Sequence, residues 1–161
     1  MQKVFFTVIL ALGCFVLENV LAQIFGPYFR PNLLLILVIF FNLYRGLRYS
    51  LLAALLAGLF KDSYSVQVFG LNTFAFVVCA HVTTIVKMYI YQVGSVVSRV
   101  LIVFLMSLLN VFLLYILHVM FSPIDFTTMF VNVLVPEVVT TTVAAPFVFE
   151  NLKQCASRLF A

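Results

Sequence analysis

The chain has 161 residues, of which 65% are hydrophobic and only 9% are charged, and its formal net charge is +4. Soluble domains carry about 25% charged residues, and so few charges would leave large apolar patches on a soluble surface. The composition therefore excludes a soluble enzyme, a secreted disulfide scaffold and a disordered tail. It predicts an all-α integral membrane protein.

Six apolar runs follow one another, separated by loops of two to eight residues: about 4–24, 31–44, 47–60, 69–90, 95–121 and 127–149. A helix needs ~20 residues to cross ~30 Å of hydrocarbon, and four of the runs are long enough. The second and third runs would each cover only ~21 Å as helices. They form either two short helices in a tight hairpin or one helix over 31–60.

The first run also has features of a signal peptide. Lys3 precedes an apolar stretch, and Val20-Leu21-Ala22 before Gln23 is similar to a cleavage site. Glu18 and Asn19 are unusual so close to such a site, which favours a retained first helix. Cleavage would leave five crossings.

Two arginines decide between the hairpin and the single helix. One helix over 31–60 would put Arg45 and Arg48 at the bilayer centre, where each Arg costs about 2.5–3.5 kcal/mol. Six crossings with a cytoplasmic N-terminus put only Arg30 and Lys61 outside. The other seven basic residues then lie inside: Lys3, Arg45, Arg48, Lys87, Arg99, Lys153 and Arg158. This positive-inside bias predicts six transmembrane helices in one domain, with both termini cytoplasmic and 150–161 as a short tail.

The same basic residues do not indicate nucleic acid, because they stand singly among apolar runs and form no patch. Cys14, Cys79 and Cys155 lie far apart without Cys-x-x-Cys or Cys/His spacing. Neither a disulfide framework nor a zinc site is expected from them, and we expect no cofactor.

Small residues repeat along the third run. Ala53 and Ala57 stand four residues apart, as do Ala54 and Gly58, and this spacing lets helices approach closely. The pattern predicts packing inside the protein first and a partner surface second.

Three polar residues fall near the centres of the later runs: His81 in the fourth, Asn110 in the fifth and Glu137 in the sixth. Polar groups inside membrane spans are costly and suggest a function. If the three meet, they form either a polar cavity or proton relay, or interhelical hydrogen bonds worth ~0.6 kcal/mol per contact. A relay usually needs more ionisable groups along a path, so hydrogen bonding between helices is favoured.

Enzyme signatures are missing from the sequence. It contains no G-x-S-x-G, no H-E-x-x-H, no Walker lysine motif and no aspartate cluster for Mg²⁺. Asp62 and Asp125 are single carboxylates on expected outer loops. The chain is therefore expected not to be an enzyme.

The stretch from 31 to 80 resembles the MreD family of bacterial inner-membrane proteins. The residues that carry the resemblance open or close the predicted helices: Pro31, Asn32, Arg45, Gly46, Gly58, Asp62, Gly70 and Asn72. Pro31 suits a helix start, where its missing N–H is harmless, and Gly46 allows a reversal. Asp62 is able to accept hydrogen bonds from the loop or from the next helix's N-terminus.

The resemblance implies a non-enzymatic scaffold of the cell-wall elongation complex, located in the bacterial cytoplasmic membrane. It implies MreC as the direct partner, and a wider complex with MreB, RodZ, RodA and a class B penicillin-binding transpeptidase. The family is also similar in fold to the substrate-binding subunits of energy-coupling-factor vitamin transporters, which gives the alternative function. Those subunits have an A-x-x-x-A pattern in the first helix, whereas here Ala11 is followed by Phe15.

Overall fold

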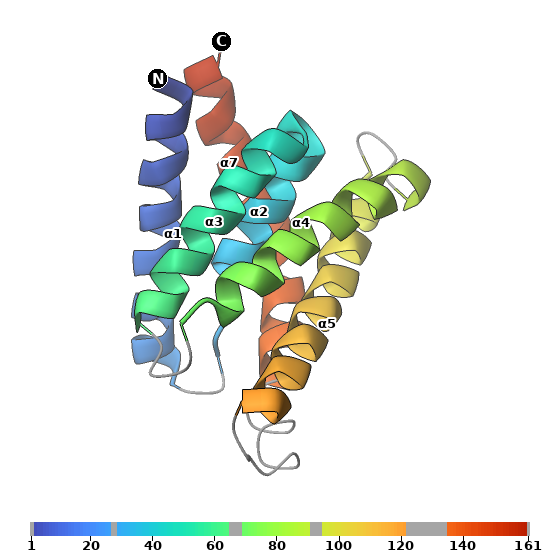
Figure 1. The fold of residues 1–161 in the computed structure, drawn as a ribbon. Coiled ribbons are helices and arrows are strands. Elements are labelled where there is room, and N and C mark those ends of the chain that lie inside the picture. The colour runs from blue at the N-terminus through green and yellow to red at the C-terminus, as the bar shows by residue number, and fades with distance from the viewer. Residues whose placement is uncertain (1, 27–28, 65–68, 91–94, 122–134, 161) are drawn as a thin grey trace.

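The computed structural model describes residues 2–26, 29–64, 69–90, 95–121 and 135–160, and this part of the chain is all-helical. Its six helices are α1 (Gln2–Phe25), α2 (Leu33–Arg45), α3 (Leu47–Tyr64), α4 (Leu71–Ile90), α5 (Val96–Phe121) and α7 (Val135–Phe160). Successive helices run in opposite directions, so α1 begins and α7 ends at the same end of the bundle (Figure 1).

Three of these helices contain stretches long and apolar enough to cross a membrane: Thr7–Phe25, Leu71–Ile90 and Val96–Met120. They belong to α1, α4 and α5. The helix α2 is apolar but shorter, with 13 residues, and therefore spans only ~20 Å.

The helix α2 forms the centre of the bundle. Every residue from Leu33 to Leu43 is buried, and the helix packs against α1, α3, α4, α5 and α7. A helix that is apolar on all sides must be surrounded by others, and this sequence, LLLILVIFFNLYR, has one uncharged polar residue. Its neighbours shield α2, so it does not need to match the bilayer thickness by itself.

Two helices cover the segment 31–60, and Gly46 separates them. Gly46 has φ 87°, and its N–H donates to the Asn42 carbonyl at 3.2 Å. Positive φ is costly for residues with a side chain, so glycine suits this break. Arg45 and Arg48 flank it and are exposed, at the end of the bundle where α1 begins (Figure 1).

The last helix differs from the expected run over 127–149. It begins at Val135, so Pro136 lies in its first turn, where the missing N–H is harmless. It then continues to Phe160, so residues 150–160 extend the same helix. Residues 127–134 lie outside the described part. The helix α3 is also longer than its expected run and ends at Tyr64.

The small residues of α3 pack inside the protein. Ala53, Ala54 and Ala57 are fully buried, and Gly58 lies directly against α4. A Cβ built on Gly58 would lie 2.3 Å from the Thr73 Cα. This contact involves backbone, so α3 and α4 approach each other as closely as they do only because residue 58 has no side chain.

We predict that Gly58→Ala lowers stability by roughly 1–3 kcal/mol, because the helices must separate to admit the methyl group. The thermal unfolding midpoint of the purified chain in detergent measures the loss. Gly13→Ala is the control, since nothing lies within 4 Å of a Cβ at Gly13. Equal midpoints for the two variants would contradict a tight contact between α3 and α4.

Candidate functional site

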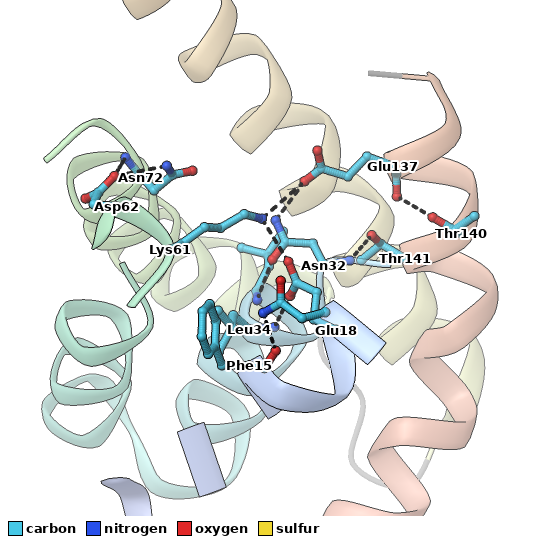
Figure 2. Close-up of polar contacts among 12 residues, drawn as sticks. Phe15, Glu18, Asn32, Leu34, Lys61, Asp62, Asn72, Glu137, Thr140 and Thr141 are labelled. Atoms are coloured by element: carbon cyan, nitrogen blue, oxygen red, sulfur yellow. Dashed lines mark hydrogen bonds and ion pairs between the residues drawn. The ribbon is translucent and has the colours of Figure 1, made fainter. Parts of the chain in front are cut away.

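Charged side chains from three helices meet beside the start of α2. Lys61 of α3 reaches between Glu18 of α1 and Glu137 of α7, as Figure 2 shows. Its Nζ lies 3.3 Å from Glu18 Oε1 and 4.0 Å from Glu137 Oε1. The three side chains are between 15% and 25% exposed, so water screens these ion pairs less than it screens a surface pair.

Asn32 joins this group to the core. It is 1% exposed, and its Nδ2 donates to Glu137 Oε1 at 2.7 Å. Its backbone N–H donates to Thr141 Oγ1 at 2.9 Å, and its Oδ1 accepts from the N–H of Leu35 at 3.1 Å. Asn32 is therefore the N-cap of α2 and also ties that helix to α7. We call Glu18, Asn32, Lys61, Glu137 and Thr141 the charged cluster.

The carboxylates of the cluster lie at the N-terminus of α2, where the helix dipole is positive. Glu18 Oε2 also approaches the Leu34 N–H, at 3.5 Å. The N-terminus of α2 thus stabilises these carboxylates.

Asp62, next to Lys61 in sequence, points to a different partner. It is 2% exposed and accepts four hydrogen bonds from the first turn of α4. Its Oδ1 receives the N–H and Nδ2 of Asn72, both at 3.0 Å, and its Oδ2 receives the N–H and Oγ1 of Thr73 at 3.0 and 2.6 Å. Asp62 therefore caps α4 and joins it to the end of α3. Gly70, with φ 102°, leads into this turn.

A second polar group lies at the opposite end of α2. Asn42 donates through Nδ2 to the Ala80 carbonyl at 2.7 Å and to Thr84 Oγ1 at 3.0 Å, both on α4. Lys87 Nζ donates to the carbonyls of Asn42 and Leu43 at 3.1 and 2.8 Å. The last carbonyls of a helix have no partner within it, so Lys87 satisfies the C-terminus of α2.

The expected meeting of His81, Asn110 and Glu137 is not found. His81 is exposed and its Nδ1 contacts the Val77 carbonyl of its own helix, at 3.0 Å. Asn110 is buried in α5, and neither of its amide atoms has a hydrogen-bond partner. Glu137 lies in the first turn of α7 and bonds to Asn32 and Lys61. His81 faces away from the buried side of α4, so the three residues do not form one cluster.

The pair of Glu18 and Lys61 and the roles of Asn42 and Lys87 were not predicted from the sequence. A signal for the pair was present, because opposite charges stood near the outer ends of two expected helices. Within the described residues, no three His, Cys, Asp or Glu side chains gather to hold a metal ion. The polar groups described above bond to helix ends and to other helices, so the arrangement fixes helix positions.

Removing the lysine of the charged cluster should be destabilising. Lys61→Met leaves two carboxylates facing each other, and we expect a loss of roughly 1–3 kcal/mol, between the values for exposed and buried pairs. Thermal unfolding in detergent measures it, and exposed Lys153→Met is the control. Adding Glu137→Gln to Lys61→Met should recover part of the loss; a double variant that is less stable by the full sum of both single effects would contradict the ion pair.

Asp62→Asn should weaken the start of α4, because the new amide turns one acceptor into a donor facing other donors. We expect a cost of about 1–2 kcal/mol and faster hydrogen exchange at the Asn72 and Thr73 amides. Ser63→Ala, at an exposed neighbouring position, should leave both exchange rates unchanged. Unchanged exchange in Asp62→Asn would show that the cap does not hold α4.

Comparison with known proteins gives one clear result. No match was found among curated proteins or among solved structures. The family model described as rod shape-determining protein MreD matches residues 1–154, nearly the whole chain. This family comprises membrane proteins with a structural part in determining cell shape, and they are not known as enzymes. The chain therefore belongs to the MreD family of rod shape-determining proteins.

Proposed function

We propose that the chain is a non-enzymatic membrane scaffold of the bacterial cell-wall elongation complex, and that it binds MreC directly. The observation that carries the proposal is the family match over residues 1–154, because that family acts in rod shape determination. The wider complex would contain MreB, RodZ, RodA and a class B penicillin-binding transpeptidase, and would support lateral peptidoglycan synthesis.

The contacts within the bundle support a scaffold. The charged cluster joins α1, α2, α3 and α7, Asp62 joins α3 to α4, and Asn42 joins α2 to α4. Such bonds hold the outer faces of the helices in fixed relative positions. A partner with a transmembrane helix then meets a preformed surface and loses less free energy to ordering on binding.

We further propose six crossings of the cytoplasmic membrane with both termini in the cytoplasm. The supporting observation is the distribution of charge. Arg45 ends α2, Arg48 lies in the first turn of α3, Lys87 in the last turn of α4, Arg99 in the first turn of α5 and Lys153 in the last third of α7. These helix ends are on the side of the bundle where α1 begins (Figure 1). Basic residues are enriched on the cytoplasmic side of membrane proteins. The charged cluster and Asp62 would then lie in the half of the bundle nearer the outer side.

The alternative is a substrate-binding subunit of a vitamin transporter of the energy-coupling-factor type. It requires a docking stripe on the first helix, and Ala11 would be part of that stripe. Ala11 is fully buried in the core of this bundle, and Phe15 packs against Phe60 with ring centroids 5.9 Å apart. Both side chains pack inside the protein, which favours the scaffold.

Co-purification tests the two functions. The tagged full-length chain, extracted from bacterial membranes in mild detergent, should recover MreC as identified by mass spectrometry. An unrelated tagged membrane protein with several spans controls for nonspecific recovery. Recovery of an ATPase with its coupling subunit, in place of MreC, would contradict the scaffold.

A matched pair of variants sharpens this experiment. Lys61→Met should reduce MreC recovery at equal protein amounts, because the helices that it ties lose their fixed positions. His81→Ala should leave recovery unchanged, since His81 is exposed and bonds within its own helix. A loss with His81→Ala and none with Lys61→Met would reverse the roles assigned to the two residues.

A further inference from the structure

One end of the bundle is strongly basic. Among the side chains that the structure describes at this end, only Glu150 is acidic. Five are basic: Arg45, Arg48, Lys87, Arg99 and Lys153. Lys87 bonds to the C-terminal carbonyls of α2. The remaining cations lie where the helix ends reach the membrane surface, so this end of the protein carries a positive potential.

Arg99 differs from the others in its position. It lies three residues after Val96, the first residue of the membrane-spanning stretch of α5, and it is half-buried. Its Nε donates to the Ser95 carbonyl at 3.2 Å, and its guanidinium carbon lies 6.0 Å from the centre of the Phe149 ring. Neither salt bridge found among the described residues involves Arg99. Its Nη1 also donates to the Tyr44 hydroxyl at 3.4 Å. The guanidinium is thus held by a carbonyl, a hydroxyl and an aromatic ring, with no described carboxylate within 4.0 Å of it.

A small recess opens beside this guanidinium, between the start of α5 and the later part of α7. Its lining is mostly apolar: Val96, Arg99, Val100, Pro146, Phe149 and Glu150. Lys153 follows Phe149 by one helical turn on the same face of α7. The neighbouring residues Val97 and Phe147 are 77% and 73% exposed. The recess therefore places a fixed cation beside apolar walls at the start of the candidate span of α5, where the proposed topology puts the lipid headgroups.

We propose that Arg99, at the edge of this recess, binds the phosphate of an anionic phospholipid. Guanidinium groups hold phosphates through paired, charge-assisted hydrogen bonds, and basic pockets between transmembrane helices are typical sites for anionic headgroups. The acyl chains run along the exposed apolar side chains of α5 and α7. The site depends on the membrane setting of α5 and not on the binding of MreC.

Glu150 affects phosphate binding in the opposite direction from Arg99. Its carboxylate lines the same recess and is exposed, so it repels a phosphate held by Arg99. Removing the charge from Glu150 strengthens binding, whereas removing it from Arg99 weakens binding. A general attraction of the membrane surface for a basic protein would not single out these two positions.

Native mass spectrometry of the purified full-length chain tests the site. The chain in detergent is incubated with equal amounts of phosphatidylglycerol and phosphatidylcholine, and retained lipid is counted. The wild type should retain phosphatidylglycerol in preference, and Arg99→Gln should lose about tenfold in affinity, as expected for one charge-assisted contact. Arg48→Gln, exposed at the same end but outside the recess, should stay within about twofold of wild type because a distant exposed charge is screened.

Circular dichroism confirms that each variant is folded before lipids are counted. If Arg99→Gln fails to fold, Glu150→Gln decides, since its exposed position makes it harmless to the fold, and it should retain more phosphatidylglycerol than wild type. Equal retention of the two lipids by the wild type overturns the proposal. Equal losses in Arg48→Gln and Arg99→Gln, or no gain in Glu150→Gln, overturn it as well, because they indicate a diffuse charge effect.

Discussion

The burial of α2 imposes the main constraint on this protein. The first N–H groups and last carbonyls of a helix need partners, and a helix buried among others must find most of them in its neighbours. Asn32 and Glu18 supply acceptors at one end, and Lys87 and the Gly46 N–H supply donors at the other. The short, apolar core helix is therefore possible only because polar side chains from neighbouring helices reach its ends.

This constraint also explains how a chain with 9% charged residues uses them. An unsatisfied polar group in a membrane protein costs several kcal/mol, so charges are kept where they satisfy a helix end or each other. Lys61 pairs with two carboxylates, and Asp62 beside it caps α4. These charged side chains hold the helices in their positions. The scarcity of charge first argued against a soluble protein, and the placement of the charges now argues for a rigid scaffold.

Features of the fold could be predicted from the sequence where the free-energy cost of placing one residue decides between two structures. Arg45 and Arg48 could not lie at a bilayer centre, which predicted the break that the structure has at Gly46. Features that depend on how a helix is rotated or where it begins could not be predicted in this way. The expected run over 127–149 put Glu137 near the centre of a helix, whereas the structure places it in the first turn of α7, bonded to Asn32. The pairing of Glu18 with Lys61 joins residues far apart in the chain, and an apolar pattern carries no information about such pairs.

The helices differ in the hydrogen bonds and ion pairs that join them to their neighbours. In the described part, side-chain hydrogen bonds and ion pairs join α1, α2, α3, α4 and α7 at several points. The helix α5 meets α2 through the contact of Arg99 with the Tyr44 hydroxyl at 3.4 Å and otherwise packs mainly on α4 and α7. Its buried polar atoms Ser107 Oγ, Asn110 Oδ1 and Nδ2 and His118 Nε2 have no hydrogen-bond partner, which costs about 1–3 kcal/mol for each such group. A lipid held by Arg99 at the start of α5 would therefore add a polar contact to a helix whose buried Ser107 and Asn110 side chains have no hydrogen-bond partner.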